Sequence, residues 1–278
     1  MSATVSDEAP GVRDIIKVGV FGAGGRMGTT VCDAVVNDPD LELVAAVDPN
    51  HGGESLASLG VPGTALDVSP TAQALRDGGA EVVVDFTVLE AARENLRWCA
   101  DHGVHAVVGT TGFSPRDLED FTQRFGAASP ANALIAPNFA IGAILMMRFA
   151  ELAAPYFETA EILELHHDQK ADAPSGTAML TLERMAEASN EWGDDPTKTT
   201  VVEGARGGVG SAGIHVHSVR LRGLVAHQEV LLGTTGQSLS IRHDSYDRTS
   251  FMPGVLLAVK AIGSRPGLTI GLDPLLDL

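Results

Sequence analysis

The densest group of side chains that could do chemistry lies in the middle of the chain, where residues 164–178 read ELHHDQKADAPSGTA. His166 and His167 stand close to Lys170, and histidine and lysine commonly act as general acids and bases. Ser175 or Thr177 could cap a helix that starts here, and the free amides at a helix start bind anions. The segment therefore predicts a site for a carboxylate-bearing substrate beside a proton donor.

Other interpretations of this segment stay open from the residues alone. Adjacent residues on a strand point to opposite faces, so both histidines can contact one ligand only if they lie on a loop. The segment could also be a solvated polar loop. A metal site would need further ligands such as His215 and His217, but no full ligand set is present and we expect no metal. The remaining histidines are interpreted as structural or surface residues: His102, His105, His227 and His243.

A glycine-rich segment near the start reads VGVFGAGGRMG over residues 18–28. The strict G-x-G-x-x-G pattern fails because Met27 occupies its last place, but a G-x-x-G-x-x-G spacing is satisfied. The first glycine allows a tight turn, the middle ones let backbone approach a pyrophosphate, and the last lets a helix pack closely on the sheet. The pattern predicts that a dinucleotide is bound by Gly22, Ala23, Gly24, Gly25, Arg26, Met27 and Gly28.

Asp48 follows a second apolar strand, 20 residues after Gly28. A carboxylate at this place is expected to meet the adenosine ribose hydroxyls, and it would repel a 2′-phosphate. Arg26 could instead hold a 2′-phosphate by bidentate hydrogen bonds. We therefore expect NADH or NADPH to serve as cofactor, with NADH at least competent.

The tetrapeptide GTTG occurs twice, and its context separates the two copies. Gly109, Thr110 and Thr111 follow a strand in the first half, at the sheet edge where ligands bind in a doubly wound fold. We expect these residues to contact the cofactor. Residues 233–236 lie between two alternating segments, so this copy is predicted to be a hairpin turn.

The elements that would position these residues alternate between strand and helix. Apolar strands are expected at 15–21, 41–47, 81–86, 105–108 and 132–135, with helices at 27–36, 90–101 and 117–125 between them. This order predicts an α/β fold with a Rossmann-type doubly wound parallel sheet. After residue 137 come helices at 141–152 and 177–190, a strand at 160–165, and alternating, antiparallel-like segments from residue 213. They predict an inserted α+β domain with an open mixed sheet.

We therefore expect a dinucleotide-binding domain from residues 15–137 and 252–278, and a substrate-binding and oligomerisation domain from residues 138–251. A helix over 251–262 would lead back into the first domain. Residues 1–14 carry neither a basic start nor an apolar stretch, so a mobile tail is expected rather than a secretory signal.

Composition excludes several functions. The formal net charge of −17 argues against binding to nucleic acid or to an anionic membrane surface. No run of about 18 apolar residues predicts a transmembrane helix. The two cysteines, Cys32 and Cys99, lack the spacing of a redox pair or zinc site and suit small buried side chains. These features indicate a cytoplasmic protein.

The string HHDQKADAPSGTA closely resembles that of the bacterial 4-hydroxy-tetrahydrodipicolinate (dihydrodipicolinate) reductase family. The glycine loop, GTTG at 109–112, APNFAIG at 136–142, RGGVGSAGIHVHSVRL from 206 and HDSYDRTSFMPGVLLA from 243 also resemble that family, in the same order. The resemblance implies NADH- or NADPH-dependent reduction of a cyclic dicarboxylate in the diaminopimelate route to lysine, by a homotetramer joined through its second-domain sheet.

By the same resemblance, His166 is a proton donor or acceptor and Lys170 a proton donor. His167, Gly176 and Thr177 would hold substrate carboxylate. The cofactor residues would include Asp48 and the segment Ala136, Pro137, Asn138 and Phe139, and Thr87 could line the nicotinamide side.

Two rival functions remain to be weighed. A different NAD(P)-dependent dehydrogenase would share the first domain but lack the HH-x-x-K-x-DAPSGT string. A non-catalytic dinucleotide sensor would need no His/Lys cluster, and a DNA-reading version should carry a basic element, which is absent.

Overall fold

The computed structural model describes residues 15–276 and divides them into two compact units. Unit 1 comprises residues 15–136 and 255–270, and unit 2 comprises residues 137–254 and 271–276. The expected tail at 1–14 lies outside the described residues. Residues 271–276, which the sequence had suggested for the first domain, lie in unit 2 instead. There Leu272 and Leu275 are buried, and Asp273 pairs with Arg184 at 2.7 Å.

Unit 1 is built on a parallel sheet of seven strands in the order β12-β6-β5-β4-β1-β2-β3. This confirms the predicted α/β fold. The central strand β4 is buried along its whole length because helices cover both faces of a parallel sheet. The strands are β1 (Ile16–Phe21), β2 (Leu41–Val47), β3 (Val68–Ser69), β4 (Val82–Asp85), β5 (His105–Val108), β6 (Ala133–Ile135) and β12 (Leu268–Ile270).

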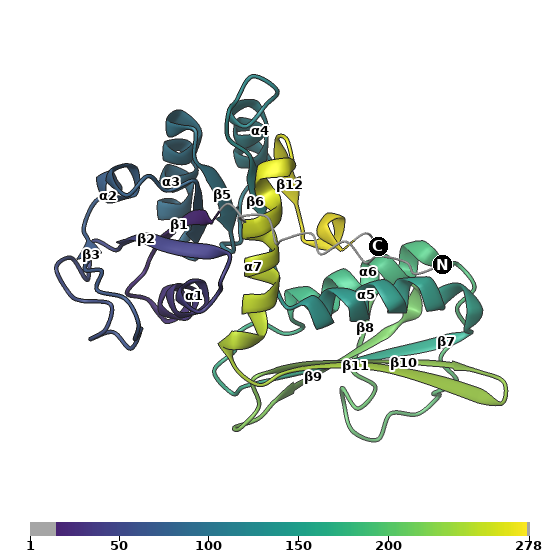
Figure 1. The fold of residues 1–278 in the computed structure, drawn as a ribbon. Coiled ribbons are helices and arrows are strands. Elements are labelled where there is room, and N and C mark those ends of the chain that lie inside the picture. Colours follow the sequence, from purple (N-terminus) through teal and green to yellow (C-terminus); the bar gives the residue numbers. More distant parts are fainter. Residues whose placement is uncertain (1–14, 277–278) are drawn as a thin grey trace, which may run out of the picture. The chain divides into compact units, whose positions relative to one another are not determined.

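Helices of unit 1 lie on both sides of its sheet, with α1 and α3 on opposite faces of the strands (Figure 1). Local signals set their ends: Ser114 and Asp117 form a capping box at the start of α4, and Gly103 ends α3 with a φ of 71°. The helices are α1 (Arg26–Val36), α2 (Gln73–Asp77), α3 (Leu89–His102), α4 (Pro115–Arg124) and α7 (Met252–Ala261), the last of which begins in unit 2.

Unit 2 contains a five-stranded sheet in the order β11-β10-β7-β9-β8. Its strands are β7 (Thr159–His166), β8 (Gly208–Val209), β9 (His215–Arg220), β10 (Ala226–Thr234) and β11 (Gln237–Ser245). The sheet is mixed as predicted, but β9 runs parallel to β7 rather than antiparallel, because the chain crosses over through α6 before it returns. The second GTTG is confirmed as a hairpin turn: Thr234 pairs with Gln237, and Gly236 has a φ of +83°.

Two helices, α5 (Ile141–Ala153) and α6 (Gly176–Ala188), cover one face of this sheet (Figure 1). Their apolar side chains pack against Ile162 and Val230 of the strands, and this contact forms the core of unit 2. Short 3₁₀ helices complete the chain: η1 (Ala154–Tyr156), η2 (Ser211–Gly213), η3 (Arg248–Phe251), η4 (Ile262–Ser264) and η5 (Asp273–Leu275).

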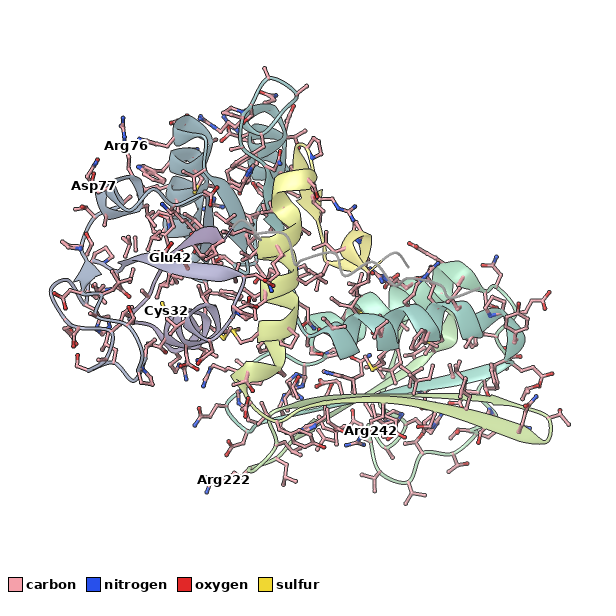
Figure 2. All side chains as sticks on the ribbon, in the orientation of Figure 1. Cys32, Glu42, Arg76, Asp77, Arg222 and Arg242 are labelled. Carbon is pink, nitrogen blue, oxygen red and sulfur yellow. The ribbon has the colours of Figure 1, made fainter. Side chains whose placement is uncertain are left out.

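Both cysteines are buried and free, as the sequence suggested. Figure 2 places Cys32 on α1, where burial raises the pKa of its thiol to about 12, and burial also raises the pKa of Cys99. Within residues 15–276, no helix is long and apolar enough to cross a membrane.

Candidate active site

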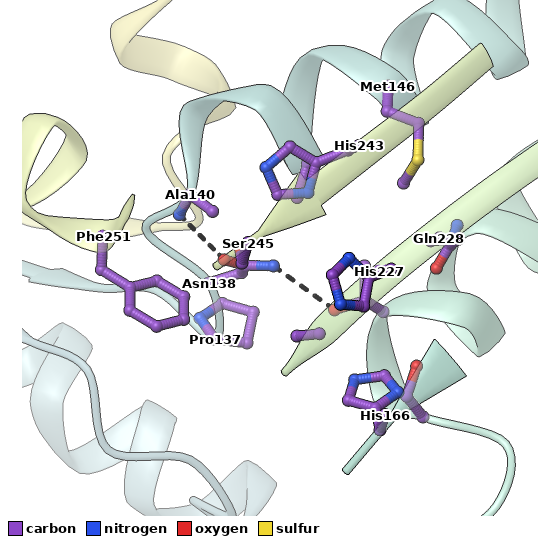
Figure 3. A pocket seen from close by; sticks show the side chains of 14 residues that line it. Pro137, Asn138, Ala140, Met146, His166, His227, Gln228, His243, Ser245 and Phe251 are labelled. Atoms are coloured by element: carbon purple, nitrogen blue, oxygen red, sulfur yellow. Dashed lines mark hydrogen bonds between the residues drawn. The ribbon is translucent and has the colours of Figure 1, made fainter. Parts of the chain in front are cut away.

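A cavity of about 200 Å³ in unit 2 lies between the sheet and the first turns of α5 and α6. Figure 3 shows its lining side chains, several of which carry polar groups. The lining consists of Pro137, Asn138, Ala140, Ala143, Met146, His166, Ser175, Thr177, Ala226, His227, Gln228, His243, Ser245 and Phe251. The cavity therefore collects polar groups from five separate segments of the chain, as a small-molecule site requires.

His166 occupies the last position of β7 and is held by the buried carboxylate of Glu164. The distance from His166 Nδ1 to Glu164 Oε2 is 2.5 Å, and Arg220 donates to both oxygens of Glu164 at 2.8 and 2.9 Å. Burial alone would raise the pKa of Glu164, but hydrogen bonds from Arg220, Ser218 and His166 hold it below its usual value. Burial lowers the pKa of His166 despite the neighbouring carboxylate, so a neutral imidazole is favoured near pH 7.

The start of α6 forms the second side of the cavity. The hydroxyl of Ser175 caps the helix by accepting from Ala178 N at 3.2 Å, as one of the two predicted capping residues. Thr177 also lines the cavity, and its hydroxyl accepts a 3.4 Å hydrogen bond from the amide of Asn138. Hydroxyls at a helix start give this wall the donors that a carboxylate needs.

The other residues expected around the substrate lie in the turn that follows β7. His167 is exposed, and its Nδ1 accepts from Gln169 N at 3.3 Å. The ammonium of Lys170 donates to both oxygens of Asp172, at 2.8 and 2.9 Å. Neither the His167 side chain nor the Lys170 side chain lines the cavity. Gly176 is the first residue of α6, next to Thr177, which does line it. The loop position of His167 meets the condition under which both histidines could contact one ligand.

Two histidines that received no functional assignment from the sequence also face this cavity. His227 on β10 pairs through Nδ1 with Asp244 at 2.6 Å, and burial lowers the pKa of His243 on β11. His243 packs against α5, because a Cβ on Gly142 would lie 2.5 Å from its ring. Both residues lie on alternating strands, where spacing alone does not tell which face is covered by helices.

The metal interpretation finds no support in the described part of the chain, where no group of three or more His, Cys, Asp or Glu side chains could hold an ion. His217 Nε2 lies 2.6 Å from Glu161, and His215 Nε2 lies 3.3 Å from Asp195. These histidines are engaged with carboxylates in separate pairs.

In unit 1, the glycine loop joins β1 to α1 as expected. Gly22 has a φ of +69°, and a Cβ on Gly28 would lie 1.9 Å from the carbonyl oxygen of Gly22. No side chain caps α1 at Gly25, and Gly25 and Arg26 are exposed. The amides at the start of α1 are thus open to an anion, and the close packing that the last glycine of a dinucleotide motif permits is present.

Asp48 follows β2 and lies beside this loop. Its carboxylate is buried and accepts from Gly24 N at 3.1 Å and from Asn50 N at 2.9 Å. The ring of His51 packs on the other side of Gly24, where a Cβ would lie 2.2 Å from it. Both contacts fix the loop next to a carboxylate, as an adenosine-binding edge requires.

The ends of β4 and β5 adjoin the glycine loop on its other side. Thr110 donates from its hydroxyl to Thr87 O at 2.7 Å, and the methyl group of Thr87 lies near Gly22. Burial raises the pKa of Asp85 at the end of β4, although hydrogen bonds from Thr87 and Asn95 partly oppose it.

Gly109, which follows β5, sits against the ring of Phe86, which leaves no space for a side chain there. The last expected cofactor segment follows β6. After Ala136 the chain leaves unit 1, so Pro137 and Asn138 line the unit 2 cavity and Phe139 is buried there. The carboxyl ends of β1, β2, β4 and β5 form one edge of the parallel sheet, and the residues present there fit a dinucleotide.

Comparison with known proteins covers nearly the whole described chain. Residues 16–139 match the family model described as dihydrodipicolinate reductase, N-terminus, and residues 142–276 match that described as dihydrodipicolinate reductase, C-terminus. The 4-hydroxy-tetrahydrodipicolinate reductase of Nocardia farcinica is 52% identical over 266 residues, which cover 95% of this chain and 99% of the relative. That of Cutibacterium acnes is 51% identical, over 95% of this chain and 100% of the relative.

Solved structures give the same result. A dipicolinate-bound dihydrodipicolinate reductase from Paenisporosarcina sp. TG-14 superposes with a TM-score of 0.83 at 40% identity, over 94% of this chain and 99% of that one. An amine dehydrogenase from Mycobacterium smegmatis reaches a TM-score of 0.62 at 15% identity, over 93% of this chain and 95% of that one. The second likeness concerns the fold alone.

Proposed function

This chain belongs to the dihydrodipicolinate reductase family, and on that premise we propose that it reduces 4-hydroxy-tetrahydrodipicolinate to tetrahydrodipicolinate with NADH or NADPH. The reaction is a step of the diaminopimelate route to lysine. The observation that carries the proposal is the placement of His166 and Thr177, from the HHDQKADAPSGTA string, on the walls of one polar cavity.

The cofactor is proposed to bind along the carboxyl edge of the unit 1 sheet. The exposed start of α1 would hold the pyrophosphate, and Asp48 would accept hydrogen bonds from the adenosine ribose. Thr87 and residues 109–111 would bind toward the nicotinamide, which supplies the hydride when it is bound, and residues 136–139 would complete the cofactor site. Exposed Arg26 can pair with a 2′-phosphate, so both NADH and NADPH are proposed to serve.

The substrate is a dianion, although the chain as a whole is strongly acidic. Gly176 and Thr177 at the start of α6 offer donors to one carboxylate, and His167 and Lys170 belong to the turn that follows β7. A local cation and a helix start can bind an anion despite the overall charge, because nearby groups dominate the potential inside a cavity.

His166 and Lys170 are proposed to handle the proton that completes the reduction. His166 is bonded to Glu164 through Nδ1, so Nε2 is the ring nitrogen left to exchange a proton with a ligand. Lys170 is held by Asp172 and would donate its proton once its ammonium turns to the substrate.

We propose a homotetramer joined through the sheet of unit 2. Leu231 on β10 is an exposed large apolar side chain, and the strand register places it on the same face of the sheet as Arg242 of β11 (Figure 2). Light scattering with size-exclusion chromatography should give four times the monomer mass. Leu231→Glu should reduce that mass, whereas a monomer in the wild-type protein would contradict the proposal.

The function is tested by following NADH and NADPH absorbance at 340 nm, with substrate generated in place from pyruvate and aspartate semialdehyde by its synthase. We expect substrate-dependent oxidation in the wild type, and a large loss of kcat in His166→Ala and Lys170→Ala with NADH binding retained. Exposed Lys198→Ala is the matched control and should keep wild-type kcat. Dinucleotide binding without turnover would favour a sensor or another dehydrogenase.

A further inference from the structure

Glu164 is a carboxylate that the reaction does not use directly, yet it is fully buried beside His166. It lies two residues before His166 on β7, so both side chains leave the strand on the same face. A carboxylate without exposure is stable only when its oxygens are fully paired. Here both oxygens are bonded: Oε1 to Arg220, and Oε2 to Arg220 and His166.

Arg220 connects this carboxylate to the turn that carries Lys170. It stands opposite His166 in the β7–β9 pairing and donates to the backbone oxygen of Asp172 at 2.6 Å. The side chain of Asp172 in turn holds the ammonium of Lys170. The Arg220 guanidinium therefore binds both Glu164, the partner of His166, and the turn that carries Lys170.

The geometry has a direct consequence for the imidazole. A carboxylate accepts hydrogen bonds only, so the short contact requires a proton on Nδ1 of His166. Neutral imidazole then carries its lone pair on Nε2. The other ionisable groups near the ring are Lys170 and Arg220, and His227 and His243 line the same cavity. None of these four groups accepts a hydrogen bond from Nδ1.

We propose that Glu164, held by Arg220, is a positioning residue that fixes His166 as the Nδ1–H tautomer and turns Nε2 to the substrate. The inference rests on the proposed function for its kinetic part. Its tautomer part can be measured without any turnover, so the two can fail separately.

The informative substitution is Glu164→Gln, which keeps the shape and one acceptor oxygen for Arg220. Arg220 donates to both oxygens of Glu164, so the glutamine can present either its nitrogen or its oxygen to Nδ1, and in both cases the negative charge that holds the proton on Nδ1 is lost. The expected result is a larger share of the Nε2–H tautomer of His166, a fall in kcat of about tenfold or more, and unchanged NADH affinity. Loss of the negative charge should also move the pH limb that belongs to His166 toward lower pH.

The same strand offers a matched control. Glu161 on β7 also bonds a histidine and an arginine, His217 and Arg206, but it lines a different cavity. Glu161→Gln removes the same kind of pairing from the same strand. It should alter the His217 resonances and leave kcat and the His166 tautomer unchanged.

The experiment uses full-length protein labelled with ¹⁵N-histidine, with ring nitrogens read by long-range ¹H–¹⁵N spectra at pH 8 and His166 assigned through His166→Gln. Wild type with Nδ1–H, and Glu164→Gln with a larger share of Nε2–H and reduced kcat, support the proposal. An Nε2–H tautomer in the wild type overturns it even if the variant does not fold. Unchanged kcat in a folded Glu164→Gln protein also overturns it, whereas absent wild-type turnover overturns the proposed function alone.

Discussion

Gly28→Ala tests whether the glycine loop is a dinucleotide site. The added Cβ would lie 1.9 Å from the carbonyl oxygen of Gly22, and its three nearest atoms are all backbone atoms, so no side chain can move aside to make room. Because real Cβ contacts stay beyond 3.0 Å, α1 or the loop must move by about 1 Å. Overpacking of this kind costs about 1–3 kcal/mol of unfolding free energy.

A cost of that size should lower Tm by about 2–4 °C for each kcal/mol in a chain of this length. Displacement of α1 also moves its free amides, so we expect the Kd for NADH to rise about tenfold, or about 1.4 kcal/mol. Thermal unfolding followed by circular dichroism measures the first effect, and NADH fluorescence titration measures the second.

Gly25→Ala is the control in the same loop. Its Cβ would meet only Gly22 O, at 3.2 Å, and its backbone angles suit any residue. It should leave Tm nearly unchanged but weaken NADH binding, because a methyl group would cover the exposed backbone. If Gly28→Ala lowers Tm while NADH affinity stays at the wild-type value, the loop is not the cofactor site and our reasoning is refuted.

Three further outcomes are expected. Asp117→Asn should lower Tm at pH 7, and its gap to the wild type should narrow as pH falls below about 3.9 and close only below the folded-state pKa of Asp117, which Arg93 and Ser114 hold well below its usual value; a gap as large at about pH 2 as at pH 7 would contradict this. Ser175→Ala should cost about 1 kcal/mol in urea unfolding through loss of the α6 cap, and an unchanged midpoint would show that the cap is unimportant. Both cysteines should resist a thiol reagent in the native protein and react after denaturation, and fast native labelling would contradict their burial.

Much of unit 1 could be read from the sequence because its signals are local. Strands β2 and β5 begin and end where the apolar runs do, and α1 starts one residue before its expected position. Short elements such as β3 and α2 carry too few residues for a periodic signal, so they were not foreseen. In unit 2, the parallel pairing of β9 with β7 was missed, because alternation along a strand reports its faces but not the direction of its neighbour.

The sequence by itself determined the chemistry of this protein: a glycine loop followed by an acid, and a His/Lys string at the start of a helix. These are contiguous motifs whose function depends on residue type and short spacing. Only the tertiary structure decided which groups share the cavity. Arg220 reaches Glu164 from a strand 56 residues later, and His227 and His243 enter from two further strands. Such partners are set by strand order and by the helices that cover one face, and neither is encoded in local spacing.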